Sequence, residues 1–532
     1  MVRAGIIGAG SSGLTAIKCC LDEGHEPVCF EKTDEVGGLW HYRGENDKFT
    51  ELGSVFKSTV INVSKERMSY SDFPCPKEFP NYMHNKQVYK YLRMYAEKFD
   101  LLKYIQFNTS VVSVRKTSDF EVSGRWDIEL KDEKSQKTRW ETFDALFVCN
   151  GHHAKPNIPD FPGIEDFQGT KVHTHYYKTP EPFKDKKVVV IGIGNSGADA
   201  AVELSRWASQ VVYLSTRRGT WVIHRLSKYG IPRDLRRTRI TTFVPSWLMN
   251  IILKSSFNSI VDHKLYGLLP KHEPLSAHPT ANDDLPNRIL NGTVILKPDI
   301  KRFTKNGVEF EDGNFEDNVD AVIIATGYSF EFSFIPESIL KAKNNQVSLY
   351  KYVFPPELEK PTLAVIGLVQ PLGALMPISE LQCRWAARVF AGLTKLPKRG
   401  KMYQNITMKK EAMAKRYVPS QRHTIQVDFI EYMDDVAIEI GVKPNFFKML
   451  FTDPVFFFKN FFGPSVPYQY RLEGPGKWEG AKNAIETVWE RVEAPLCNGK
   501  GKVRQPSYIK VVLLIVVGIC VVICSYFASC FS

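Results

Sequence analysis

The N-terminal residues show a change of hydrophobic pattern that is typical of a strand, a helix and a second strand. Ala4–Ile7 is a short apolar run, Leu14–Glu23 is a helical stretch, and Pro27–Phe30 is apolar again. A second strand, helix and strand follow from Lys187 onward. Repeated alternation of this kind predicts an α/β fold with two Rossmann-like units built on parallel sheets.

A glycine-rich turn joins the first strand to its helix. In Gly8-Ala9-Gly10-Ser11-Ser12-Gly13 the first glycines allow a tight turn and close backbone approach, and the third lets helix and strand pack. The N-terminus of the following helix stabilises a pyrophosphate. Glu31 ends the second strand, where a carboxylate accepts hydrogen bonds from a ribose. These residues predict a dinucleotide site.

The second unit repeats the turn but ends differently. Lys187–Ile191 is the predicted strand, Gly192-Ile193-Gly194-Asn195-Ser196-Gly197 the turn, and Ala198–Ala208 the helix. The next strand, Val211–Leu214, runs into Ser215-Thr216-Arg217-Arg218, and a guanidinium there suits the 2′-phosphate that distinguishes NADP from NAD. An acid at the first site and arginines at the second predict FAD in the first unit and NADPH in the second.

The predicted cofactor contacts divide between the two units. On the FAD side they are Gly8, Gly10, Ser12, Gly13 and Glu31, with Gly38, Leu39 and Trp40 in the short Gly37-Gly38 turn, which is expected near the flavin. On the NADP side they are Gly192, Gly194, Asn195, Ser196, Gly197, Ser215, Thr216 and Arg217.

Two further strand ends, Phe147–Gly151 and Ala321–Tyr328, mark where the chain passes between the units, and we expect them to be mainly structural. The predicted parts are an FAD-binding domain (1–153 and 331–442), an NADP-binding domain (154–219 and 294–330), a helical insertion (220–293), a C-terminal tunnel or membrane-associated region (443–507) and a transmembrane tail anchor (508–532).

Two apolar stretches lie outside the nucleotide units. Trp247–Leu253 in the insertion and the aromatic stretch Phe451–Phe462 each admit three interpretations: the lining of a substrate tunnel, a membrane contact, or ordinary core packing.

Composition is that of a globular protein with more than one core. The chain has 532 residues, 43% of them hydrophobic, and a net charge of +12. The positive charge suits anionic phosphates or a negative membrane face, but no basic aromatic module is present, which argues against a nucleic-acid partner. The adjacent His152 and His153 lack further ligands at metal-binding spacing, so no metal site is expected.

The C-terminal residues differ from the rest of the chain. Val511–Ser532 carries no charge, and this apolar length is enough to span a bilayer. Lys500, Lys502, Arg504 and Lys510 precede it, which by the positive-inside rule keeps the upstream body in the cytosol. A buried core helix is the alternative.

The segment Phe167–Tyr177 is similar to the identifying motif of the flavin-containing monooxygenases, F-x-G-x-x-x-H-x-x-x-Y/F. Its matching residues are Phe167, Gly169, His173 and Tyr177. With the two glycine turns and Ala325-Thr326-Gly327-Tyr328, the chain resembles vertebrate members of this family from end to end. The stretches Asn282–Pro286 and Pro377–Gln382 are most similar to the isoform 5 type.

The resemblance also implies a catalytic residue. Asn62, in Ile61-Asn62-Val63-Ser64, matches the family asparagine that lies beside the reactive edge of the flavin. Two segments depart from the family: Thr174-His175-Tyr176, where members usually have Ser-Arg after the histidine, and Phe49–Ser54, where they carry Arg-Ala-Ser. Altered phosphate and flavin contacts are expected there. His173 is expected to link or pack rather than to act as an acid or base.

The activity that the resemblance implies is flavin monooxygenation. NADPH reduces FAD, the reduced flavin takes up O2 as a C4a-hydroperoxide, and a soft nucleophile, such as a small lipophilic nitrogen or sulfur xenobiotic, takes the distal oxygen. Baeyer-Villiger oxygenation of ketones and an uncoupled NADPH oxidase that releases hydrogen peroxide are the alternatives. By the same resemblance the membrane is that of the endoplasmic reticulum.

Two other classes of protein fit the glycine turns less well. A flavin disulfide reductase requires a redox Cys-x-x-Cys, which the sequence lacks. A degenerate nucleotide-binding interaction protein would not be expected to keep both turns. The oligomeric state is open, and a homo-oligomer is compatible with the sequence.

Overall fold

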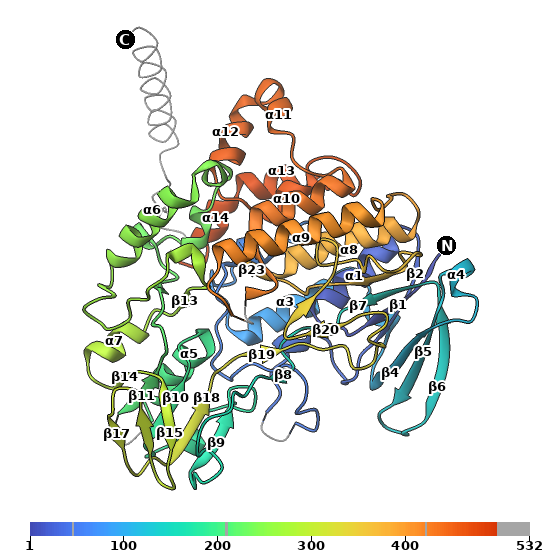
Figure 1. The fold of residues 1–532 in the computed structure, drawn as a ribbon. Coiled ribbons are helices and arrows are strands. Elements are labelled where there is room, and N and C mark those ends of the chain that lie inside the picture. Colours follow the sequence, from blue (N-terminus) through green and yellow to red (C-terminus); the bar gives the residue numbers. More distant parts are fainter. Residues whose placement is uncertain (45–46, 208–210, 421–422, 497–532) are drawn as a thin grey trace.

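The computed structural model describes residues 1–44, 47–207, 211–420 and 423–496 (Figure 1). Two five-stranded parallel sheets form the centres of two units, which confirms the predicted α/β fold. The first sheet has the order β22 (Leu363–Val365), β7 (Ala145–Val148), β1 (Arg3–Ile7), β2 (Glu26–Phe30) and β3 (Ile105–Gln106). The second has the order β14 (Val294–Lys297), β11 (Val212–Ser215), β10 (Val188–Ile191), β18 (Ala321–Ile324) and β9 (Thr170–His173).

Helix α1 (Ser11–Asp22) lies between the first sheet and the long helix α8 (Met376–Phe390) (Figure 1). Nine consecutive residues, from Ser12 to Cys20, are buried because both sides of α1 are covered. The small residues among them, such as Gly13 and Ala16, let the helix approach the sheet closely. The remaining helices of this unit include α3 (Asn85–Lys98), α9 (Arg399–Arg416) and α10 (Phe429–Ile440). An antiparallel sheet of β4 (Thr109–Lys116), β5 (Trp126–Asp132) and β6 (Thr138–Phe143) covers one end.

The second sheet follows directly from its sequence. Val188–Ile191 is fully buried at the centre of the sheet, as expected for a β-branched run in a parallel sheet. Helix α5 (Asn195–Leu204) packs beside it, with α7 (Leu285–Leu290) and the antiparallel strands β15 (Ile300–Phe303), β16 (Val308–Phe310) and β17 (Phe315–Glu316) around it.

The predicted end of α5 was wrong. The helix stops at Leu204, and Ala208 lies outside the described residues. The Ser205 hydroxyl donates to the Val202 carbonyl at 2.8 Å, and the N–H groups of Arg206 and Trp207 bond three residues back. A tight turn of this kind ends an α-helix.

The two units are joined where two short strands cross between them. β8 (Lys155–Pro156) pairs antiparallel with β19 (Tyr328–Ser329), so the outward and returning segments lie side by side. After β19 the chain supplies β22 to the first sheet. The domain boundaries given above stay predictions.

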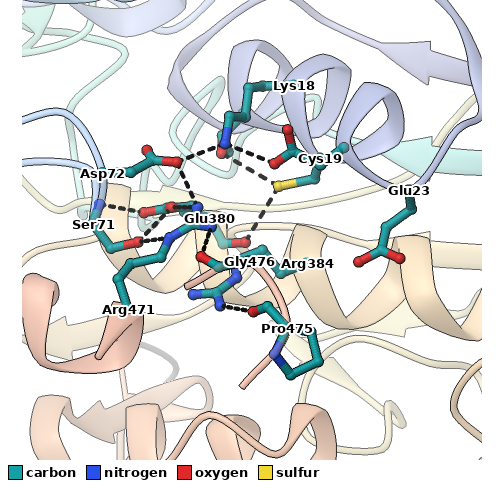
Figure 2. Close-up of polar contacts among 12 residues, drawn as sticks. Lys18, Cys19, Glu23, Ser71, Asp72, Glu380, Arg384, Arg471, Pro475 and Gly476 are labelled. Atoms are coloured by element: carbon teal, nitrogen blue, oxygen red, sulfur yellow. Dashed lines mark hydrogen bonds and ion pairs between the residues drawn. The ribbon is translucent and has the colours of Figure 1, made fainter. Parts of the chain in front are cut away.

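A buried network of ion pairs holds the C-terminal segment against α1, as Figure 2 shows. Arg471, at the end of the 3-10 helix Pro467–Arg471, contacts Glu380 at 2.6 Å and Asp72 at 2.9 Å. Lys18 of α1 contacts Asp72 at 2.6 Å, and Ser71 donates to Glu380 from its backbone and its hydroxyl, both at 2.6 Å. Loss of one partner from such a network is costly because a charge stays buried and unpaired. The network therefore fixes the helix that carries the first glycine turn.

The insertion lies along one side of the molecule, and two of the C-terminal helices project from its body (Figure 1). The insertion contains α6 (Ser246–Asn258), and the projection contains α11 (Phe446–Thr452) and α12 (Pro454–Phe462), followed by α13 (Ala481–Glu486) and α14 (Val488–Glu493). Core packing, one of the three interpretations of these stretches, is wrong for most of their residues. Phe456 is buried, but Trp247, Ile251 and Phe451 are 66%, 57% and 71% exposed.

The predicted tail anchor, residues 508–532, lies outside the described residues. Within the part of the chain that the structure describes, no helix has both the length and the apolar character needed to cross a membrane.

Candidate functional site

The first glycine turn is shaped to accept a phosphate group. Gly8 has φ +96°, a left-handed conformation that favours glycine, and a Cβ at Gly13 would lie 1.8 Å from the Gly8 carbonyl oxygen. The turn and α1 therefore need glycine at both places. No side chain caps the N-terminus of α1 at Gly10, so its first N–H groups are available to an anion. These observations fit the pyrophosphate of FAD.

Glu31 is held rigidly at the end of β2. Its carboxylate accepts hydrogen bonds from the Ala9 N–H at 2.8 Å and from the Thr33 N–H and hydroxyl at 2.9 and 2.8 Å. Three donors leave acceptor capacity for a ribose hydroxyl, since an ionised carboxylate has about four lone-pair sites. The short Gly37-Gly38 turn packs against the first glycine turn: Gly37 donates to the Ala9 carbonyl, and a Cβ at Gly38 would lie 3.0 Å from the Gly10 Cα.

The second glycine turn has the same geometry as the first. Gly192 has φ +102°, and a Cβ at Gly197 would lie 1.8 Å from the Gly192 carbonyl oxygen. A cavity of about 380 Å³ extends from this turn along the end of β11. Its lining includes Gly192, Gly194, Ser215, Thr216, Arg217 and Arg218.

Arg217 is placed to meet an anion at the outer end of this cavity. Its side chain is 71% exposed, and the carboxylate of Asp299 lies 3.9 Å away. Ser215 is buried and donates to the Pro298 carbonyl, while the Thr216 hydroxyl accepts from the Gly219 N–H. The arrangement fits the 2′-phosphate of NADP, with the arginine as ligand and the two hydroxyl side chains shaping the loop.

A second cavity, of about 280 Å³, lies where the two units face each other. Leu39, Trp40 and Asn62 of the first unit line it together with Gly194, Asn195 and Ser196 of the second turn. Gly194 borders both cavities. The structure therefore brings the predicted catalytic asparagine and the inner end of the predicted NADP turn to one place.

Asn62 and Asn195 are both fixed by hydrogen bonds to their side-chain oxygens. Arg225 Nη2 donates to Asn62 Oδ1 at 2.6 Å, and the Ala281 N–H donates to Asn195 Oδ1 at 2.8 Å. Arg225 and Ala281 belong to the insertion, so the insertion reaches both sides of the cavity. Sequence reasoning missed Arg225, since it belongs to no motif.

Asp199 is a second functional candidate that the motifs did not identify. It lies one helical turn after Asn195 on α5, lines the same cavity, and accepts a hydrogen bond from Asn282 Nδ2 at 2.7 Å. Burial raises the pKa of Asp199 to about 6, although the nearby Arg225 opposes the rise. The spacing from Asn195 was the available signal, because residues four apart share a helix face.

The loop Ala325–Tyr328 and the pair His152 and His153 also reach the cavity. Tyr328 packs against the rings of His153, His173 and His175 at the crossing between the units. The segment is thus part of the cavity wall as well as a structural connection. Among the described residues no group of three His, Cys, Asp or Glu side chains could hold a metal ion.

His173 packs rather than facing the cavity. It is 2% exposed, its Nδ1 accepts from the His175 N–H, and its Nε2 donates to the Gly327 carbonyl at 3.1 Å. Burial lowers the pKa of His173 to about 4, so the ring is neutral near pH 7.

The two segments that depart from the family pattern contact each other. The ring of His175 bonds the Thr50 carbonyl at 2.5 Å through Nε2, and Lys178 donates to the Ser54 hydroxyl. His175 is buried, whereas Tyr176 is exposed. The departures therefore form one contact between the units instead of two separate changes.

The predicted residues fall into three groups, with Ser12 apart from them. Gly8, Gly10 and Gly13 form the first turn, with Glu31 and Gly38 beside it, and Gly192, Gly197, Ser215, Thr216 and Arg217 form the outer NADP region. Asn62, Leu39, Trp40, Gly194, Asn195 and Ser196 meet at the shared cavity. Ser12 is buried and donates to the Ser379 hydroxyl at 3.0 Å, which ties α1 to α8.

Comparison with known proteins gives one consistent result. The family model described as flavin-binding monooxygenase-like matches residues 2–531. The chain is 53% identical over 501 residues, 93% of each chain, to flavin-containing monooxygenase 5 of Rattus norvegicus. It is 46% identical over 532 residues, 98% of each chain, to dimethylaniline monooxygenase (N-oxide-forming) 2 of Mus musculus. Among solved structures, S-allyl-L-cysteine S-oxygenase of Allium sativum is similar with a TM-score of 0.62 and 26% identity, covering 83% of this chain and 88% of that one.

Proposed function

Because the chain belongs to the flavin-binding monooxygenase-like family and is an FAD- and NADPH-dependent monooxygenase, we propose that it oxygenates nitrogen and sulfur compounds in the cavity shared by Asn62 and Asn195. One oxygen atom of O2 goes to the substrate, and the other leaves as water with the two electrons of NADPH. The observation that carries this proposal is the meeting of Asn62 with the second glycine turn in one cavity.

The names of the relatives support this class of substrate. One relative is an N-oxide-forming dimethylaniline monooxygenase, and a structural neighbour is an S-oxygenase of S-allyl-L-cysteine. Nitrogen and sulfur lone pairs are soft nucleophiles, and their oxygenation needs no further acid or base from the protein. Small lipophilic amines and sulfides are therefore the proposed substrates.

The proposed cofactor contacts follow the geometry of the two turns. Gly8, Gly10 and Gly13 bring the backbone to the pyrophosphate of FAD, and Glu31 accepts from its ribose. Gly38, Leu39 and Trp40 lie toward the flavin. Gly192, Gly194, Asn195, Ser196 and Gly197 hold the NADP pyrophosphate, and Ser215, Thr216 and Arg217 surround the 2′-phosphate.

When bound, FAD accepts a hydride from NADPH and supplies the reduced ring that activates O2. The protein positions the reactants. Asn62 donates hydrogen bonds into the cavity from its amide group, and donors that are already in place cost little reorganisation during the reaction. Leu39, Trp40 and Phe56 form apolar wall in the same cavity and limit the access of water.

The test is a three-way balance with the full-length holoenzyme. NADPH oxidation, oxygenated product and hydrogen peroxide are measured with N,N-dimethylaniline, a dialkyl sulfide and a simple ketone. We expect nearly one N-oxide or sulfoxide per NADPH. If only the ketone gave an oxygenated product, the enzyme would be a Baeyer-Villiger oxygenase instead. If hydrogen peroxide formed without any oxygenated product, it would be an NADPH oxidase.

We also propose that the chain binds the endoplasmic reticulum membrane, with its catalytic body in the cytosol. The sequence Val511–Ser532 supports this, and so does the surface of exposed Trp247, Phe447 and Phe451. Flotation of the full chain with phosphatidylcholine and phosphatidylserine vesicles tests it. Val516→Arg should release most of the protein, because a charge in an apolar span costs about 3 kcal/mol, and Phe447→Ser with Phe451→Ser should release less. Wild-type protein that stays at the bottom of the gradient would refute the proposal.

A further inference from the structure

Arg225 of the insertion reaches across to the loop that carries Asn62. Its Nη2 donates to Asn62 Oδ1 at 2.6 Å, and its guanidinium also lies 3.4 Å from the backbone oxygens of Val60 and Ile61. The side chain is 13% exposed, so solvent competes little for these bonds. One arginine therefore holds three consecutive residues of a loop about 160 positions earlier in the sequence.

The contact fixes which end of the Asn62 amide faces the cavity. A guanidinium has donors and no acceptor, so only the Asn62 oxygen can meet it. The two amide hydrogens of Asn62 must then point away from Arg225, and Asn62 lines the cavity. Without Arg225 the amide could turn, and it would then present its oxygen, an acceptor, to the same place.

Asp283 keeps the guanidinium in this orientation. Its two carboxylate oxygens accept from Arg225, one from Nη1 at 2.7 Å and one from the backbone N–H at 2.8 Å. The fork of the guanidinium thus spans an acid on one side and Asn62 on the other. A lysine has no such fork and cannot reproduce the arrangement.

The residues next to Asp283 are bound to the second glycine turn. The Thr280 hydroxyl donates to the Ile193 carbonyl at 2.6 Å, the Ala281 N–H donates to Asn195, and Asn282 donates to Asp199. The short segment 280–283 therefore connects the predicted NADP turn with the arginine that holds Asn62.

The insertion holds the same loop at a second point. Asp234 Oδ2 accepts from both the N–H and the hydroxyl of Ser64 at 2.8 Å. The Asn62 loop is thus bound on both sides of the asparagine by residues of one insertion.

We propose that Arg225 is a positioning residue for Asn62: with Asp283 as its counter-ion, it directs the Asn62 amide hydrogens into the reaction cavity. The inference rests on the proposed catalytic role of Asn62. In this arrangement the insertion contributes to the chemistry through the first unit's loop, in addition to any contact with substrate.

A double-mutant cycle tests the proposal. The variants are Arg225→Met, Asn62→Ala and the double variant, each as flavin-loaded full-length enzyme, with product formed per NADPH as the readout. Arg233→Met is the matched control, because Arg233 is also partly buried in the insertion. Among the described residues its guanidinium bonds the carbonyls of His224 and Leu226 and the Ser256 hydroxyl and lies over the Phe257 ring, without a bond to the Asn62 loop.

We expect Arg225→Met to lower product per NADPH by about tenfold, the value of one hydrogen bond to a charged group, with a matching rise in hydrogen peroxide. In the Asn62→Ala background the same substitution should cause no further loss, since the two residues act as a unit. Flavin content and the KM for NADPH should stay within about twofold of the wild-type values, as they should for Arg233→Met, which should also keep its product yield.

Equal losses from Arg225→Met in both backgrounds would overturn the proposal, because they would show a general structural effect. An Arg233→Met variant that loses as much product per NADPH as Arg225→Met would also overturn the proposal. If Asn62→Ala itself keeps full product yield, the proposed role of Asn62 fails and the inference falls with it. A loss in Asn62→Ala with none in Arg225→Met refutes the inference alone.

Discussion

Replacing Asp199 by asparagine should stabilise the protein at neutral pH, although it removes a charged group next to an arginine. Asp199 is half-buried on α5, and the substitution keeps its shape and its bond from Asn282. Burial raises the pKa of Asp199 from 3.8 to about 6, despite the opposing effect of Arg225. The native state therefore binds the proton more tightly than the unfolded chain does, and ionisation destabilises the fold.

The size of the effect follows from linkage. A rise in pKa from 3.8 to about 6 corresponds to about 3 kcal/mol. Because the native pKa is raised, the stabilising contribution of the neutral acid is complete below pH 3.8 and is lost as pH rises through about 6. Asparagine has no such dependence. The gain from Asp199→Asn should be about 3 kcal/mol near pH 7.5, about half of that near pH 5, and close to zero near pH 3.5.

The assay is thermal unfolding of the flavin-loaded protein without NADPH, comparing wild type and Asp199→Asn at about pH 7.5 and pH 5. In a domain of about 150–250 residues, a stability change of 1 kcal/mol shifts the unfolding temperature by about 2–4 °C. We therefore expect a rise of several degrees at the higher pH. Asp317→Asn, the same substitution at an exposed position, serves as the matched control in the two buffers. An unchanged or lower unfolding temperature near pH 7.5, or a gain equal at both values, would show that Asp199 does not carry the proposed burial cost.

Two further substitutions test the cofactor contacts. Gly13→Ala should yield protein without flavin, measured by the ratio of flavin to protein absorbance, because its Cβ would lie 1.8 Å from the Gly8 carbonyl oxygen. The control Gly400→Ala, with no atom within 4 Å of the added methyl, should bind flavin normally. A flavin-loaded Gly13→Ala variant would contradict the geometry. Arg217→Ala should raise the KM for NADPH by roughly tenfold or more and leave the KM for NADH nearly unchanged, since only NADPH carries the 2′-phosphate. Equal changes in the two KM values would show that Arg217 does not bind the 2′-phosphate.

The sequence by itself determined the two nucleotide units. An apolar run such as Val188–Ile191, followed by a glycine turn and a helical stretch, predicts a central strand, and the glycines of both turns lie where backbone atoms would otherwise collide. The acid at Glu31 and the arginine at Arg217 then distinguish the two turns. These features are local, so a pattern of neighbouring residues is enough to predict them.

The tertiary structure alone decided how the two units make one cavity. Asn62 and Asn195 are 133 positions apart, and Arg225 and Asp283, which hold Asn62, belong to an insertion outside both nucleotide motifs. The surroundings of Asp199 likewise depend on packing, because its pKa is set by burial and not by its neighbours in sequence. Local patterns record where the chain turns and what it can bind. Contacts between distant segments determine which way an amide points and how strongly an acid holds its proton.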